Sequence, residues 1–268
     1  MTEKAARFKQ PGFCRRSGAV ASSELHSFWG GAAAGIALLV FLGLLGFFFY
    51  NNVAGYVLSS LNAAAKGASI DAGLALFSQG LTQTPLIMML VAPLVTMRTL
   101  ASFRRGGTLD FFLTLPISLN QLIYGQFLAA WISLSFMSLL SLAPFMVLVL
   151  TGVGQWPVIM ITALGYVSLA ALFAGVGLMC SAAFSSPVGA GLGTLGVLGL
   201  MWVLGWASPY ADKGMADFLQ GLAFAPRITR MATGLLNLND LFFFFALTML
   251  ALIGTRLFLS ARATSGAD

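Results

Sequence analysis

Long apolar runs separated by short polar stretches dominate the chain, and six of them have the length of a membrane-spanning helix. A helix needs about 20 apolar residues to cross the hydrocarbon core of a bilayer. The runs are continuous rather than alternating, so the pattern excludes a transmembrane β-barrel and predicts an all-α polytopic membrane protein. The predicted spans cover residues 31–58, 78–97, 119–150, 158–183, 188–207 and 241–259.

Proline and glycine interrupt these runs at defined positions. Pro85 and Pro93 are expected to kink the second span, which membrane helices tolerate when neighbours satisfy the freed carbonyls. The third span is longer than the hydrocarbon core demands, so we expect a tilt or a break at Pro144. The glycines at 152 and 154 predict a tight turn before the fourth span, and Ser185–Pro187 a turn before the fifth. Gly189 and Gly193 have the spacing of a close helix contact.

The polar stretches divide the chain into three parts. Residues 1–22 are basic and predict a disordered tail, residues 23–262 form the membrane domain, and residues 263–268 are a second tail. The aromatic-ended stretch 22–29 predicts a short interfacial helix, and its His26 is expected at the membrane entry rather than in a ligand site. The stretch 208–240 mixes charged and apolar residues, which predicts short interfacial or re-entrant helices.

The polar segment from Met97 to Gln121, between the second and third spans, is the most informative part of the sequence. Arg104 and Arg105 suit the end of a helix, because cations favour its negative C-terminal end. The Gly-Gly pair that follows stops that helix, and Thr108 can cap a new one with Asp110 in its first turn. Pro116 limits this new helix to about two turns.

Two uses of this short helix remain open. It presents apolar side chains and is too short to cross a bilayer. It is either a membrane-surface element whose apolar side chains lie among the headgroups, or a docking element that fills a groove on a cytosolic partner. After it, Ser118 and Gln121 have the spacing of a capping box, which predicts the start of the third span.

Composition supports the membrane assignment and sets the orientation. The 268 residues are 59% hydrophobic and only 8% charged, whereas soluble domains carry about 25% charged residues. The net charge of +6 comes from cations at the ends of apolar runs rather than from a nucleic-acid-binding patch. With alternating spans, ten Lys and Arg residues fall on one side and four on the other. The positive-inside rule then places both termini and the 97–121 segment in the cytoplasm.

The sequence lacks the residues that several kinds of functional site require. No phosphate-binding Gly-x-x-x-x-Gly-Lys-Ser/Thr motif is present, so ATP binding through such a loop is excluded. One histidine and two distant cysteines cannot build an ordinary zinc or redox site. We therefore expect no catalytic, cofactor-binding or metal-binding residues. Spans three to five hold no ionisable groups, which argues against proton coupling and leaves sodium coupling through carbonyls and hydroxyls open.

Three sets of residues resemble the ABC-2 type permeases, most closely the gliding-motility (GldF-like) subgroup. The central set is Met97-Arg98, Arg104 to Asp110, Leu113 to Pro116 and Gly125 to Ala130. The others are Glu24 to Phe28 with Phe47 to Tyr50, and Gly234 to Phe243 with Thr255-Arg256. The resemblance covers nearly the whole chain after the tail.

The resemblance implies the membrane subunit of an ATP-driven transporter, an exporter in the bacterial inner membrane. The chain itself is then not an enzyme. Two copies, or a homologous pair, would sit in the lipid bilayer on two cytosolic ABC ATPase subunits, with no nucleic acid involved. The resemblance further implies a coupling helix in the 97–121 loop. Its candidate contacts with the ATPase are Arg104, Arg105, Thr108, Leu109, Asp110, Phe111, Phe112 and Leu113.

The sequence departs from the family pattern at two places. Ser102 and Phe103 stand where acidic residues are common, and Gln126 stands where a basic residue is usual. The salt bridges expected at these positions cannot form. Two other functions remain open. One is a membrane scaffold or assembly component of a motility or envelope-maturation complex, and the other is a secondary carrier driven by an ion gradient.

Overall fold

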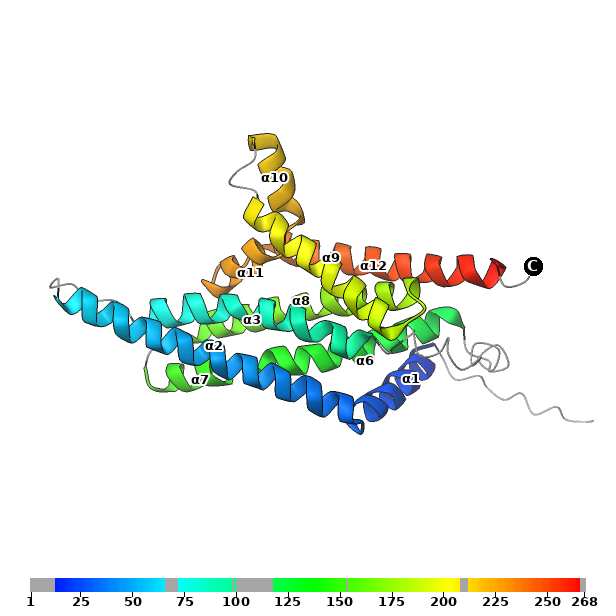
Figure 1. Ribbon diagram of the computed structural model, residues 1–268, viewed down its shortest axis with the longest axis horizontal. Helices are drawn as coiled ribbons and strands as arrows, with labels where there is room; N and C mark the ends of the chain where they lie inside the picture. Colours follow the sequence, from blue (N-terminus) through cyan, green and yellow to red (C-terminus); the bar gives the residue numbers. More distant parts are fainter. Residues whose placement is uncertain are drawn as a thin grey trace, which may run out of the picture.

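A computed structural model describes residues 13–65, 72–97, 99, 118–152, 154–207 and 212–265, and throughout these ranges the regular structure is helical. Most of the long helices run along the long axis of the molecule, while α10 projects away from it (Figure 1). The helices are α1 (Phe13–Trp29), α2 (Ala32–Ala65), α3 (Ala72–Thr96), α6 (Leu119–Leu140), α7 (Ala143–Leu150), α8 (Trp156–Ala183), α9 (Pro187–Ala207), α10 (Lys213–Leu222), α11 (Ala225–Ala232) and α12 (Leu238–Ser265).

Five described helical stretches are long and apolar enough to cross a membrane: α2, α6 with α7, α8, α9 and residues 238–261 of α12. The architecture is that of a helical multi-pass membrane protein. The predicted second span, residues 78–97, overlaps the helix α3 as far as Thr96 and is not among these five described stretches. Gln79, Thr82, Gln83 and Thr84 place amides and hydroxyls in one stretch of this helix.

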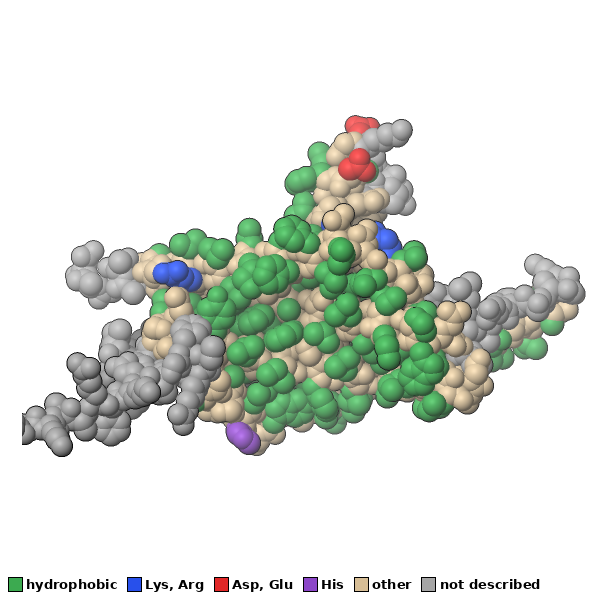
Figure 2. Space-filling view, turned by 180° about the vertical axis from the view of Figure 1, so that it is seen from behind, with side chains coloured by type: hydrophobic (Ala, Val, Ile, Leu, Met, Phe, Trp, Pro, Cys, Tyr) green, Lys and Arg blue, Asp and Glu red, His purple; other side chains and the backbone are tan. Residues whose placement is uncertain are grey.

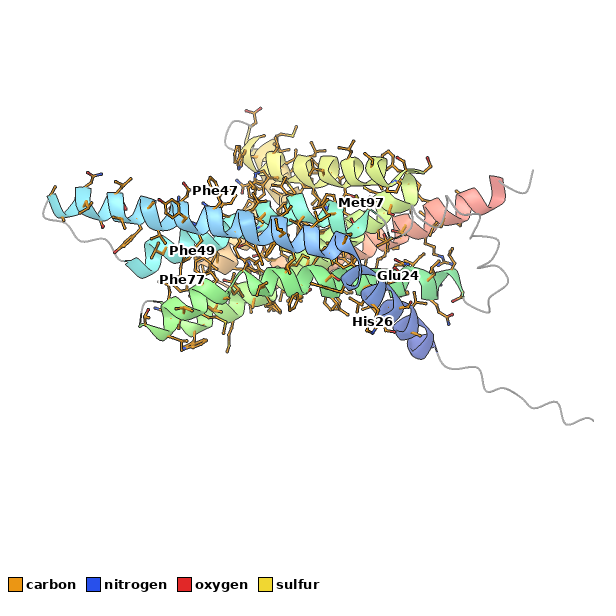
Figure 3. The ribbon with its side chains drawn as sticks, turned by 60° about the horizontal axis from the view of Figure 1, so that its bottom comes forward. Glu24, His26, Phe47, Phe49, Phe77 and Met97 are labelled. Atoms are coloured by element: carbon orange, nitrogen blue, oxygen red, sulfur yellow. The ribbon has the colours of Figure 1, made fainter. Side chains whose placement is uncertain are left out.

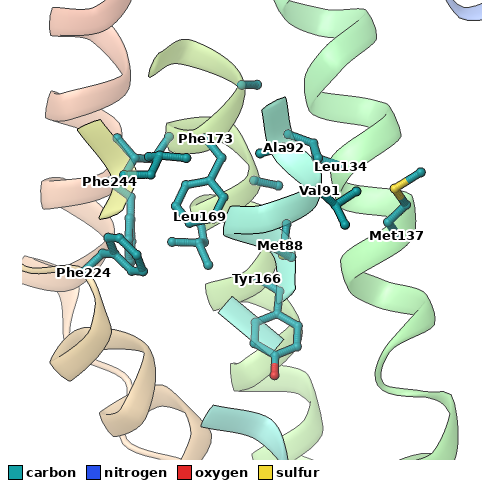
Figure 4. Close-up of a cluster of buried hydrophobic side chains, with 14 of the residues drawn as sticks. Met88, Val91, Ala92, Leu134, Met137, Tyr166, Leu169, Phe173, Phe224 and Phe244 are labelled. Atoms are coloured by element: carbon teal, nitrogen blue, oxygen red, sulfur yellow. The ribbon is translucent and has the colours of Figure 1, made fainter. Parts of the chain in front are cut away.

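The two central helices are α3 and α8. Helix α8 packs against α12, α6, α9, α3 and α11, and α3 packs against α2, α8, α9, α11 and α6. Their contact surfaces form the core (Figure 4), in which Tyr166, Leu169 and Phe173 of α8 are fully buried beside Val91 and Ala92 of α3.

The outer surface carries many large apolar side chains. Figure 2 shows hydrophobic side chains spread across one face, with charged side chains at an end of the bundle and on and below the α10 projection. Large side chains such as Leu39, Leu150 and Phe242 are more than 70% exposed. Such surface suits a lipid environment, because lipid tails are as apolar as these side chains.

The predicted breaks are confirmed. The third span divides into α6 and α7 at Ser141 and Leu142, with Pro144 in the first turn of α7. Gly152 and Gly154 have positive φ angles of 86° and 112°, a backbone conformation that glycine adopts without steric cost, and α8 follows them. Helix α9 begins at Pro187, after the predicted turn.

The predicted boundary of the N-terminal tail is wrong. Helix α1 begins at Phe13, so residues 13–22 belong to a helix that continues through the predicted interfacial stretch to Trp29. The physical reason is packing: α1 lies along α6, and Ser17 and Ala21 are buried in that contact. The basic residues near 15 made this segment look like a tail in the sequence.

The stretch 208–240 contains short helices, as predicted. Helix α10 is exposed over most of its length, whereas α11 packs against α3 and α8 with Ile228 and Met231 buried. Gly234, with a φ angle of 84°, ends this segment before α12 begins. Helix α11 therefore belongs to the bundle, whereas α10 packs against α9 and projects from the bundle.

Candidate functional site

The predicted coupling residues lie outside the described part of the chain. These eight candidates are Arg104, Arg105, Thr108, Leu109, Asp110, Phe111, Phe112 and Leu113. What the structure describes is how the segment that carries them leaves α3 and re-enters the bundle at α6. Figure 3 shows Met97 at the end of α3 and Glu24 of α1 toward the same end of the molecule, away from Phe77.

The re-entry point is a capping box. The Ser118 backbone N–H donates to Gln121 Oε1 at 3.0 Å, and the Gln121 N–H donates to Ser118 Oγ at 3.4 Å. This reciprocal pair satisfies two backbone donors that have no partner within the helix. The predicted start of the third span is confirmed, and the capping box holds the end of the polar segment at Ser118.

The exit point is held by a close contact with α8. Thr96 is fully buried, and its hydroxyl donates to the Ala92 carbonyl at 2.9 Å. A Cβ placed on Gly177 of α8 would lie 2.2 Å from Thr96 Oγ1, so only glycine fits there without a shift. The last turn of α3 therefore rests directly on the α8 backbone.

Helix α1 is fixed to α6 beside these two points. The Gln126 side-chain amide donates to Glu24 Oε1 at 2.9 Å, and the Trp29 indole N–H donates to Ser133 Oγ at 3.3 Å. Gly125 lets Val20 approach so closely that an added Cβ would lie 2.6 Å from its Cγ1. Two polar bonds and one close backbone approach thus set how α1 lies on the bundle.

A basic residue at position 126 would form a salt bridge, whereas Gln126 forms a neutral-amide hydrogen bond to Glu24. Its side chain is fully buried, and its amide pairs with the half-buried Glu24. Burial raises the pKa of the Glu24 carboxyl above its ordinary value, and the hydrogen bond from Gln126 offsets part of that rise.

A polar cluster lies between α2 and α3, away from this end. The side-chain amides of Asn52 and Gln83 exchange hydrogen bonds of 3.0 and 3.3 Å. Two residues before Gln83, the Leu81 carbonyl accepts a hydrogen bond from the Tyr166 hydroxyl of α8. Pro85 has no N–H to donate to that carbonyl, so the tyrosine replaces the missing helical bond.

A buried ion cluster joins α11 to α12. Asp240 is fully buried and accepts from Arg227 at 2.8 Å and from Arg230 at 2.6 Å. Arg227 also donates to the Gly221 carbonyl and lies 3.9 Å from the centre of the Phe243 ring. Two guanidinium groups on one carboxylate compensate the cost of burying it and fix α11 against the start of α12.

These polar contacts were not predicted from the sequence. The sequence offered only weak signals for them. Asn52 and Gln83 are amide residues within long helices, and Arg227, Arg230 and Asp240 are charged residues at most 13 positions apart. Neither signal shows which groups meet. Within the described ranges, no group of three or more His, Cys, Asp or Glu side chains is arranged to hold a metal ion.

The sequence was also compared with protein-family models and with curated proteins, and nothing matches in either comparison.

Proposed function

We propose that this chain is the membrane subunit of an ABC-2 type transporter, driven by separate cytosolic ATPase subunits that dock on the 97–121 segment. The proposal includes a second permease copy or a homologous permease, a bacterial inner membrane, and export as the direction of transport. It begins from the resemblance of the Arg104–Asp110 motif and its flanking spans to that family.

The observation that carries the proposal is the arrangement around the two ends of the 97–121 segment. The segment leaves α3 where Thr96 rests on Gly177, and it returns at the Ser118 capping box of α6. Helix α1 is bonded to the same helix α6 through Gln126. A force on the segment would thus reach both α3 and α6 directly, and α1 through α6.

The central position of α3 and α6 supports the same function. Helix α3 packs against α2, α8, α9 and α11, so a displacement of its last turn would be felt by most of the bundle. Closely packed protein interiors transmit strain rather than absorb it. A membrane subunit that has no ATPase of its own requires such a helix, one that packs against most of the bundle and adjoins the segment on which the ATPase docks.

The experiment is affinity purification of the full chain in mild detergent, with identification of the bound ATPase and measurement of its activity. Replacing Phe111, Phe112 and Leu113 with Ser should remove the ATPase while membrane insertion is retained. The matched control replaces exposed apolar residues of α10, Met215 and Phe218, with Ser. The control should keep the ATPase bound.

Four outcomes contradict the proposal. One is retention of the ATPase by the triple variant, and another is labelling of a cysteine at Gly107 by an impermeant reagent in intact cells. Uptake that follows an ion gradient without any ATPase would point to a secondary carrier instead. A stable complex that binds the ATPase but moves no substrate after reconstitution would favour the membrane scaffold.

A further inference from the structure

A pocket of about 280 Å³ lies where α1, α3 and α6 meet the start of α2. Its polar lining is made of Glu24, Ser27, Thr99, Gln126 and Ser133, and its apolar lining includes Phe28. Among its described lining residues Glu24 is the only charged one, and none is basic. We call it the Glu24 pocket.

One buried acceptor in this pocket has no partner. Gln126 is fully buried and donates its amide N–H to Glu24, while its Oε1 atom is buried without a hydrogen bond. An unsatisfied buried carbonyl costs about 1–3 kcal/mol. Gln126 is one of the residues that line the pocket, so a donor bound there is a candidate partner for this atom.

The other polar groups of the pocket also offer acceptors. The Thr99 hydroxyl already donates to the Thr96 carbonyl, so its lone pairs remain for a ligand. Ser133 Oγ accepts from Trp29. The second Glu24 oxygen is not used by Gln126, whose bond goes to Oε1. Burial raises the pKa of the Glu24 carboxyl, and the bond from Gln126 offsets part of that rise.

We propose that the Glu24 pocket binds a primary ammonium group, with its positive charge on the Glu24 carboxylate and an N–H directed to Gln126 Oε1. An ammonium carries three donors and no acceptor, which matches the available acceptors of Glu24, Gln126 and Thr99. Its volume is just below the range of drug-sized sites, so it suits a headgroup-sized amine. Apolar walls would contact the short carbon linker of that amine.

The position of the pocket indicates the source of the amine. Trp29, at the end of α1, is 37% exposed, and Trp side chains concentrate at the level of the lipid headgroups. Gly30 and Gly31 join the amphipathic α1 to the apolar α2 at this point, and Gly31 lines the pocket. We therefore assign the ammonium to the headgroup of phosphatidylethanolamine. This assignment does not depend on the proposed transport function.

The test measures lipid binding to the full chain by native mass spectrometry in detergent. Phosphatidylethanolamine should bind at least about tenfold more tightly than its N,N,N-trimethylated counterpart phosphatidylcholine, which has the charge but no N–H donor. Glu24→Gln and Gln126→Leu should each remove this preference. Asp217→Asn, on the exposed α10, removes a charge elsewhere and should leave it unchanged.

The outcomes separate the alternatives. Equal binding of the two lipids by the unchanged chain, with no thermal protection by ethanolamine, overturns the proposal, whether or not the variants fold. Retained preference in both Glu24→Gln and Gln126→Leu overturns the assignment to this pocket. Thermal protection by ethanolamine alone, lost in Glu24→Gln and without any lipid preference, supports the ammonium site and overturns the lipid as its source.

Discussion

The Tyr166 hydroxyl of α8 donates a hydrogen bond to the Leu81 carbonyl of α3, the acceptor that Pro85 leaves without its helical donor. Tyr166 is fully buried, so water cannot replace the bond. A proline within a central helix is thus tolerated because another helix supplies the donor.

Tyr166→Phe should lower the free energy of unfolding by about 1–3 kcal/mol, because it leaves the Leu81 carbonyl unsatisfied. Thermal unfolding of the detergent-solubilised chain measures this loss. Adding Pro85→Ala restores a backbone N–H and should recover part of it. Tyr50→Phe, at a residue that is 72% exposed, is the control and should have little effect. An unchanged melting temperature for Tyr166→Phe would contradict the role given to the hydroxyl.

The Asn52–Gln83 pair should show a measurable coupling energy. In a double-mutant cycle with Ala at both positions, we expect about 0.6–1.7 kcal/mol, the range for hydrogen bonds between membrane helices. Asn51 offers a matched control because its amide bonds only to the Phe47 carbonyl of its own helix and is exposed. Additive effects of the two substitutions would show that the amide pair does not hold α2 to α3.

Asp240→Asn should be among the most destabilising single substitutions in the chain. It removes the charge that compensates Arg227 and Arg230, and breaking a buried ion pair costs about 3–5 kcal/mol. Chemical unfolding in detergent, or loss of monodisperse protein, measures the effect. Asp212→Asn, at an exposed position, should be near neutral. A small effect at Asp240 would show that α11 is held by its apolar contacts alone.

Gly177→Ala should disturb the last turn of α3, because its new Cβ would overlap Thr96 Oγ1. Overpacking of this kind costs about 1–3 kcal/mol. Gly199→Ala is the control, since a Cβ there meets no atom within 4 Å. The stability of each variant is measured by thermal unfolding. If the Gly177 variant instead matches the Gly199 variant, Thr96 moves freely and the contact does not anchor the exit point.

The raised pKa of Glu24 gives stability a defined pH dependence. Between its unfolded value near 4.5 and its higher folded value, the folded chain holds the proton more tightly. Stability is therefore greatest below about pH 4.5 and falls as pH rises through this window, as far as Glu24 is concerned. Glu24→Gln should make the free energy of unfolding depend less on pH, in a detergent solution without amines. Unfolding measured from pH 4 to 7 tests this prediction. An equally steep fall in the variant would assign it to other groups.

The helical architecture and its breaks could be predicted from the sequence because they depend on local chemistry. Apolar runs of span length, the Pro144 break, the glycine turn before α8 and the Ser118 capping box each follow from residues close together in the chain. The absence of a phosphate-binding loop and the resemblance at the 97–121 segment are likewise properties of the sequence itself.

Only the tertiary structure decided which residues meet between helices. The spacing of Gly189 and Gly193 suggested a close helix contact, yet their nearest neighbours are Ser186 and Phe184 from the adjoining turn. The glycines that do admit a neighbouring helix include Gly177 and Gly125, which no spacing singled out.

The pairing of Glu24 with Gln126, 102 residues apart, likewise depends on how α1 lies on α6. The tail boundary was wrong for the same reason, since burial against α6 outweighed a polar, basic local sequence. Local patterns determine where a helix begins and ends, but the rotation and contact of each helix are set by the packing of all of them together.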